Sequence, residues 1–130
     1  MADYLSSEWI DALRAAARAD EELARAAAEV ELVLQQHVTD TPEGTVSYYV
    51  TFDRGEVFVQ AGEVAEPDVA FVQDYATATA VARGELNALE ALQKGKISIH
   101  GDARALTRNQ QVLAALDHSF SQVRTETTYR

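Results

Sequence analysis

The hydrophobic residues of this chain change their spacing near Glu29, and that change limits the possible folds more than any other feature. Before it, Trp9, Ile10 and Leu13 recur at the spacing of a helix with one apolar face. After it, apolar and polar residues alternate, most regularly over residues 46–52, which is the pattern of a strand with one buried face. Helical spacing returns later in the chain. The sequence therefore predicts helices packed against a sheet.

The predicted order is two helices, four strands, two helices, a fifth strand and a long final helix. Strands are expected over residues 30–38, 46–52, 56–61, 68–73 and 96–100. Runs of strands separated from runs of helices are typical of α+β folds. We therefore predict a five-stranded antiparallel sheet covered on one side by helices. A chain of 130 residues is the length of one domain, so residues 1–130 are expected to form a single domain.

Turn and capping residues mark the ends of several predicted elements. Residues 53–55, Asp-Arg-Gly, are short enough for a hairpin, and the glycine supplies the positive φ that such turns need. Asn87 and Glu90 have the spacing of a capping box at the start of a short helix. Asp102 is expected to be the N-cap of the longest helix.

The composition excludes several classes of function. There are 11 basic and 21 acidic residues, and the formal net charge of −10 opposes nucleic-acid binding. The chain has no cysteine, so no disulfide or cysteine-ligated metal is expected. The first residues lack a secretion signal, no apolar run is long enough to span a bilayer, and the last residues are not a peroxisomal address. We expect a cytoplasmic protein without stable membrane insertion.

The charge is unevenly distributed along the chain. Acids outnumber bases up to residue 74, whereas bases slightly outnumber acids over residues 75–130. Solvated acids on loops and strand faces are one explanation of this pattern. The other is that the C-terminal helical part approaches an anionic lipid or an acyl carboxylate.

The residue patterns of common catalytic sites are missing. His37, His100 and His118 are scattered and lack the spacing of metal ligands. Ser98, His100 and Asp102 are neighbours in sequence, whereas a catalytic triad meets through the fold. The chain also has no nucleophile-elbow motif and no phosphate-binding glycine loop. We therefore expect no catalytic residue, no cofactor and no metal, and the protein is not expected to be an enzyme.

Apolar side chains on the predicted sheet face and on the later helices remain to be explained. They either pack together into a filled core or leave a pocket between them, and the sequence leaves both possibilities open. Polar groups that converge within such an apolar layer would mark a small-molecule site.

Two runs of sequence resemble the sterol carrier protein family. The first is Pro67-Asp68-Val69, which leads into a predicted strand. The second is Gly95-Lys96-Ile97-Ser98-Ile99-His100-Gly101-Asp102, which follows Gly84-Glu85-Leu86 and a short helix. The predicted hairpin that begins with Tyr49-Val50-Thr51-Phe52-Asp53 also fits the early strands of that family. The similarity covers nearly the whole chain.

The resemblance implies an apolar tunnel between sheet and helices that accepts acyl chains, acyl-CoA or sterol-like lipids. Such a domain carries its ligand without chemistry, and the missing peroxisomal ending and alanine-rich helices suggest a bacterial stand-alone member. Inward-facing residues are then expected to contact the lipid. These candidates are Tyr48, Val50, Phe52, Val59, Phe71, Leu86, Leu89, Leu92, Ile99, Leu106, Leu113, Leu116 and Phe120.

Two other functions are compatible with the same sequence. The fold could have a filled core and serve as an accessory subunit that binds a partner enzyme. The chain could also be a pocketed enzyme of the nuclear-transport-factor-like cone type, which likewise begins with helices and continues into a sheet. That last reading ranks lowest, because those folds end in strands and this chain is predicted to end in a long helix.

Overall fold

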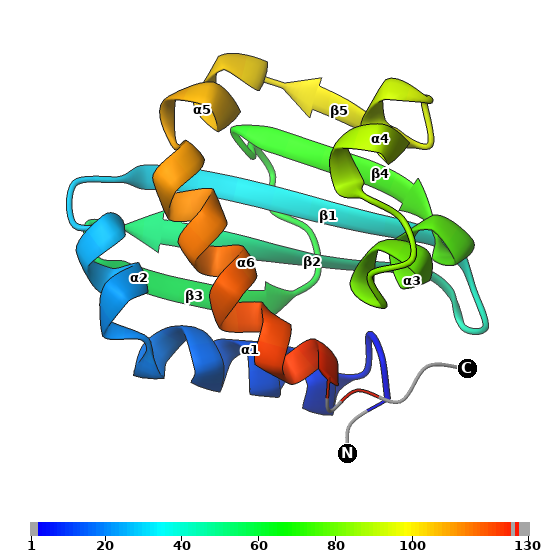
Figure 1. The fold of residues 1–130 in the computed structure, drawn as a ribbon, viewed down its shortest axis with the longest axis horizontal. Helices are drawn as coiled ribbons and strands as arrows, with labels where there is room; N and C mark the ends of the chain where they lie inside the picture. The colour runs from blue at the N-terminus through cyan, green and yellow to red at the C-terminus, as the bar shows by residue number, and fades with distance from the viewer. Residues whose placement is uncertain (1–2, 126, 128–130) are drawn as a thin grey trace.

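The computed structural model describes residues 3–125 and 127, apart from the side chains of residues 88, 89, 121, 122 and 125. Its centre is a five-stranded sheet with helices on one face (Figure 1). The strands are β1 (Glu31–Thr41), β2 (Gly44–Asp53), β3 (Glu56–Ala61), β4 (Val69–Asp74) and β5 (Ile97–Gly101). The helices are α1 (Ser7–Ala19), α2 (Glu21–Ala26), α3 (Tyr75–Ala82), α4 (Ala88–Gln93), α5 (Ala103–Arg108) and α6 (Gln110–Thr125).

The strands lie in the order β3-β2-β1-β4-β5, with β1 at the centre. Antiparallel pairing joins β1 to β2, β2 to β3 and β4 to β5, whereas β1 and β4 are parallel. The α+β fold is confirmed, and the sheet is mixed rather than wholly antiparallel. The parallel pair arises because the chain leaves β3 at one edge, crosses behind the sheet and enters β4 beside β1 (Figure 1).

A buried glutamine fixes this crossover to the outer face of the sheet. Gln35 on β1 is 1% exposed, and its Nε2 donates hydrogen bonds to the carbonyl oxygens of Tyr48 and Gly62, each at 3.0 Å. Its Oε1 accepts a hydrogen bond from the backbone N–H of Val64 at 2.8 Å. A buried amide is stable only when its polar atoms are paired, and the backbone of β2 at Tyr48 and of the crossover at Gly62 and Val64 supplies these partners.

The inner face of the sheet forms the core with the helices. The register places Leu34 opposite Val50 on one side and Val69 on the other, so all three side chains face the same way. They pack against apolar residues of α1 and α6, including Leu13 and Leu116. Helix α6 crosses this face diagonally, while α1 lies along β3 (Figure 1). The helices therefore cover one side of the sheet, as predicted.

The prediction that the longest helix begins at Asp102 is wrong. Asp102 caps only the short helix α5, accepting a hydrogen bond from the backbone N–H of Arg104 at 3.0 Å. The chain leaves helical geometry at Asn109, where φ is −116° and ψ is 29°. The side-chain amide of Asn109 donates to the carbonyl oxygen of Ala105 at 2.7 Å, and such local bonding competes with the helical backbone pattern. The longest helix, α6, begins after this break.

Helix α3 begins at a carboxylate that makes its stability pH-dependent. The Oδ1 atom of Asp74 accepts a hydrogen bond from the backbone N–H of Thr77 at 2.7 Å. This bond and one from the Thr77 side chain hold the pKa of Asp74 below its ordinary value of 3.8, and the positive charge of Lys96 adds to the effect. Because folding lowers this pKa, the stabilisation is complete above about pH 4 and is lost as the pH falls through the folded-state value.

We expect Asp74→Ala to lower the free energy of unfolding by about 1 kcal/mol near neutral pH, the typical value of an N-cap. Urea unfolding near pH 7 and near pH 3 measures this loss, which should shrink at the lower pH. Asp74→Asn is the control, since asparagine keeps the cap without the titrating charge. An equal loss for Asp74→Ala at both pH values would contradict this account of the helix start.

Candidate binding cavity

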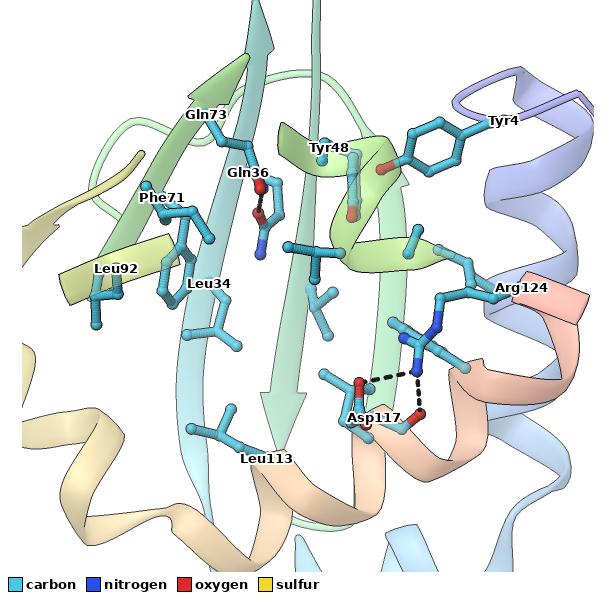
Figure 2. Close-up of a pocket in the computed structure, with 18 of the residues that line it drawn as sticks. Tyr4, Leu34, Gln36, Tyr48, Phe71, Gln73, Leu92, Leu113, Asp117 and Arg124 are labelled. Carbon is cyan, nitrogen blue, oxygen red and sulfur yellow. Dashed lines mark hydrogen bonds and ion pairs between the residues drawn. The ribbon is translucent and has the colours of Figure 1, made fainter. Parts of the chain in front are cut away.

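A cavity of about 420 Å³ lies between the inner sheet face and the helices. Strands β1, β2, β4 and β5 form its floor, and all helices except α2 contribute to its walls (Figure 2). Its volume lies within the roughly 300–1,000 Å³ of typical small-molecule sites. Its lining consists of Tyr4, Trp9, Leu13, Leu34, Gln36, Tyr48, Val50, Phe71, Gln73, Ala78, Val81, Ala82, Leu92, Ile97, Ile99, Leu106, Leu113, Leu116, Asp117, Phe120 and Arg124.

One end of the cavity is apolar. Phe71 on β4 and Ile99 on β5 are register partners and face the helices. Leu92 of α4, Leu106 of α5 and Leu113 of α6 complete this end from above. In Figure 2, Phe71 and Leu92 are neighbours and Leu113 lies below them, and all three are on the side of the cavity away from Arg124. An alkyl chain in this region would lose contact with water without meeting a charged group.

Two glutamines interrupt the apolar floor. Gln36 lies on β1 between Leu34 and Val38, which face the same way. Gln73 lies on the neighbouring strand β4, and its Nε2 donates a hydrogen bond to Oε1 of Gln36 at 3.4 Å (Figure 2). These amides can offer both donors and acceptors to a polar atom inside the cavity.

A charged pair lines the opposite end, contributed by α6. The Nη2 atom of Arg124 is 3.0 Å from Oδ1 of Asp117 and also donates to the Asp117 carbonyl oxygen at 3.3 Å (Figure 2). The Arg124 side chain is 25% exposed, whereas that of Asp117 is 72% exposed. The Arg124 side chain as a whole is therefore the more buried of the two, and the Asp117 side chain is mostly exposed. Among the residues that the structure describes, these two are the charged members of the cavity lining.

An aromatic cluster stands beside the charged pair. The Trp9 ring packs edge-to-face against Tyr48 and Tyr4, with ring centroids 5.5 Å and 4.9 Å apart. Burial raises the pKa of Tyr48 to about 12, although the positive charge of Arg124 partly opposes that rise. The phenol of Tyr48 therefore stays protonated at physiological pH and can donate a hydrogen bond to an acceptor in the cavity.

Most of the candidates chosen from the sequence meet in this one cavity. Those that line it are Tyr48, Val50, Phe71, Leu92, Ile99, Leu106, Leu113, Leu116 and Phe120. Phe52 and Val59 are on the same sheet face but are 1% and 0% exposed and lie in the packed core outside the lining. Leu86 is half-buried in the connection between α3 and α4 and is also outside the lining. The side chain of Leu89 lies outside the described residues.

The polar lining residues other than Tyr48 were missed, although the sequence carries a signal for some of them. Gln36 falls in an otherwise apolar alternation with Leu32, Leu34 and Val38, and a polar residue at such a position is unusual. Asp117 and Arg124 are seven residues apart on one helix, a spacing that places both on the same face. The N-terminal contribution of Tyr4 has no comparable signal, because it depends on how the first turn docks.

Most of the side chains that line this cavity are apolar, and its polar members include two amides, two phenols and one charged pair. Among residues 3–125 and 127, no three or more histidine, aspartate or glutamate side chains are placed to hold a metal ion. Within the same part of the chain, no helix is both long and apolar enough to cross a membrane. What the cavity offers is an apolar slot with amide, phenol and guanidinium donors.

Comparison with known proteins places this geometry in context. The model of the SCP-2 sterol transfer family matches residues 10–114. A conserved hypothetical protein from Thermus thermophilus is similar at 25% identity and TM-score 0.76, over 95% of this chain and 91% of that one. A crystal structure of sterol carrier protein 2 has TM-score 0.74 at 23% identity, over 92% and 98% of the two chains, and shows a shared fold.

A third structure is similar as well. It is the solution structure of palmitated SCP2L2 from Aedes aegypti, with TM-score 0.62 and 26% identity, covering 82% of this chain and 94% of that one. A comparison with curated proteins finds no match.

Proposed function

Because the chain belongs to the SCP-2 sterol transfer family, we propose that it binds a single apolar ligand in its cavity and carries it without chemistry. The ligands are fatty acyl chains, acyl-CoA or sterol-like lipids, and residues 1–130 act as one lipid-binding domain in the cytoplasm. The residues proposed to contact the ligand are the cavity-lining members of the sequence-based candidates, together with the newly placed Leu34, Gln36, Gln73 and Arg124.

The observation that carries this proposal is an apolar cavity with polar groups at defined places. Transfer from water to an apolar site gains about 0.8 kcal/mol for each buried methylene, so a shaped slot is sufficient for affinity. Reversible transport requires binding of this kind, from which the ligand can be released again. The cavity also weighs against the alternative of an accessory subunit with a filled core, which would leave no space of about 420 Å³.

The relative from Aedes aegypti supports an acyl chain as one ligand class, because its solved structure is that of a palmitated protein. That protein is 26% identical to this chain over most of both sequences. We therefore choose fatty acids as the first probes for this protein.

Native mass spectrometry tests the proposal. We expect the purified protein to carry lipid adducts above its mass of 14.2 kDa, and the adducts should disappear after delipidation. Added dodecanoate should then raise the free energy of unfolding by about 2.7 kcal/mol at a hundred times its Kd, because it binds only the folded state. A protein that carries no lipid and gains no stability from fatty acid or acyl-CoA would have a filled core in solution, and the proposal would be wrong.

A further inference from the structure

Three uncharged polar side chains form one patch on the floor of the cavity. The register places Gln36 on β1 directly opposite Tyr48 on β2. In an antiparallel pair, the Cβ atoms of such residues are about 4.5–5.5 Å apart. On the other side of β1, Gln36 is opposite Phe71, and Gln73 follows two residues later on β4. Figure 2 shows the three polar side chains along one side of the cavity, and we call them the polar patch.

The polar patch has hydrogen-bonding atoms that the protein does not use. The bond from Nε2 of Gln73 to Oε1 of Gln36 leaves the other amide atom of each residue without a partner among the described residues. Turning both amides over would reverse this bond and still leave one nitrogen and one oxygen unused. The Tyr48 hydroxyl likewise has no hydrogen-bond partner in the described part of the chain. Burial raises its pKa to about 12, so it stays protonated and is a donor.

These unused atoms are accessible to a small polar group. In the part of the chain that the structure describes, the fully enclosed side-chain atoms without a partner are Trp9 Nε1 and Thr79 Oγ1. The unused atoms of the polar patch are not among them, so a group the size of water can reach each one. An alkyl chain laid against the patch would displace that water without replacing its hydrogen bonds, which is unfavourable. A ligand that fills the cavity therefore gains from a polar atom at this place.

We propose that the polar patch binds the hydroxyl group of an otherwise apolar ligand, an aliphatic alcohol. The inference rests on the proposed function, to which it adds one chemical group of the ligand and the residues that recognise it. A hydroxyl group fits because it accepts hydrogen bonds and also donates one. It accepts from the Tyr48 hydroxyl and from Nε2 of Gln36, and it donates to Oε1 of Gln73.

The apolar part of the ligand continues from the patch along the floor. Leu34 lies two residues before Gln36 on β1 and faces the same way, and Phe71 is the register partner of Gln36 on β4. In Figure 2, Leu34 lies between the polar patch and Leu113. A hydroxyl group held at the patch therefore leaves its alkyl chain against these apolar side chains.

Calorimetric titration with 1-octanol and 1-chlorooctane tests the proposal. The probes share one alkyl chain, but only the alcohol donates a hydrogen bond and accepts one well. The readout is the ratio of the two Kd values, because the probes also differ in hydrophobicity. We expect Tyr48→Phe to reduce the relative affinity for 1-octanol about fivefold, the usual effect of losing one uncharged hydrogen bond. The ring is kept, and with it the edge-to-face contact with Trp9.

Gln36→Met is the second variant, and it removes the amide while keeping most of the side-chain volume. It should also reduce the relative affinity for 1-octanol about fivefold, since it deletes one partner of the hydroxyl group. A purely structural role of either residue would weaken both probes alike and leave the ratio unchanged.

The outer face of the sheet supplies matched controls. Tyr49→Phe removes a hydroxyl from the next residue of β2, where it is bonded to Gln60 outside the cavity. Gln60→Met removes an exposed amide that does not line the cavity. Both variants should keep the ratio of the unaltered protein.

The side-chain amide signals of the unaltered protein give a second readout, which remains informative if a variant fails to fold. In nuclear magnetic resonance spectra, the Nε2 protons of Gln36 and Gln73 should shift further with saturating 1-octanol than with saturating 1-chlorooctane. Those of Gln60 should respond to neither probe. Equal shifts of the two patch glutamines with both probes would overturn the inference.

The possible outcomes separate this inference from the proposed function. If the unaltered protein binds neither probe, the proposed function fails, and the inference fails with it. If it binds both probes and the ratio stays the same in Tyr48→Phe and Gln36→Met, the function stands and the hydroxyl site is wrong. A ratio that changes equally in the control variants would also contradict it, because the effect would then not arise at the patch.

Discussion

Leu113→Glu is expected to weaken the binding of dodecanoate at least a hundredfold while the protein still folds. Leu113 lines the apolar end of the cavity from α6 and is only half-buried, so the fold can tolerate its loss. A carboxylate there would draw water into the slot and oppose an alkyl chain, because burying a charge without a partner is strongly unfavourable. A hundredfold loss corresponds to about 2.7 kcal/mol, comparable to the burial of a few methylenes.

The neighbouring position supplies the control. Ala114 is exposed on the same helix and does not line the cavity, so Ala114→Glu adds the same charge to the same element. Calorimetric titration should give this variant the affinity of the unaltered protein. If Leu113→Glu binds dodecanoate normally while folded, the apolar end of this cavity does not hold the chain.

The largest effect on stability is expected for Gly101→Ala. Gly101 ends β5 with φ at +101°, and a Cβ atom there would lie 2.4 Å from the carbonyl oxygen of Asp68. That oxygen accepts a hydrogen bond from the backbone N–H of Asp102 at 2.9 Å, so it cannot move without losing the bond. Backbone strain of about 1–3 kcal/mol and a weakened hydrogen bond add up to a loss of about 2–4 kcal/mol.

Gly95→Ala separates the effect of the steric clash at position 101 from the effect of the positive φ. Gly95 also has a positive φ, at +75°, but nothing lies within 4 Å of the position of its added Cβ. Its replacement should cost only about 1–2 kcal/mol, the cost of placing a residue with a Cβ atom in the left-handed region. Equilibrium unfolding in urea measures both variants. Equal losses would mean that the close approach to Asp68 has no effect on stability.

This junction also gives a structural reason for two of the sequence runs that suggested the family. Two hydrogen bonds join Asp68 to Val33: the Asp68 backbone N–H donates to the Val33 carbonyl oxygen at 3.0 Å, and the side-chain Oδ2 of Asp68 accepts from the Val33 N–H at 2.8 Å. The carbonyl oxygen of Asp68 accepts the hydrogen bond from the backbone N–H of Asp102. The Asp68 and Gly101-Asp102 positions therefore join β1, β4 and β5 at one end of the sheet. They shape the floor of the cavity without lining it.

The strands could be predicted because each one shows a local alternation of apolar and polar residues. The alternation of residues 46–52 puts Tyr48 and Tyr49 on opposite faces, and the structure places Tyr48 in the cavity and pairs the Tyr49 hydroxyl with Gln60 outside it. The parallel pairing of β1 with β4 could not be predicted in this way. A strand has the same alternation whichever strand it pairs with. The pairing depends on the crossover that Gln35 anchors, and its partners are 13 to 29 residues away in sequence.

The cavity was partly predictable for a similar reason. An inward-facing apolar residue can be chosen from the spacing of the apolar residues around it. This spacing explains why Phe71 and Leu113, which line the cavity, were among the candidates. The same period does not say whether that residue meets another side chain or an open space, so Phe52 and Val59 were chosen and lie in the packed core. Arg124 was missed because a lone arginine near a helix end is most often a solvated residue.

Nuclear magnetic resonance with carbon-13-labelled dodecanoate tests the central claim most directly. Isotope-filtered nuclear Overhauser effects should connect the ligand methylenes to the methyl groups of Leu34, Val50 and Leu113, which line the cavity. The methyl groups of Val33 and Val72, on the outer face of the sheet, should show none. Contacts to the outer face alone, or no contacts at saturating ligand, would contradict an alkyl chain held between sheet and helices.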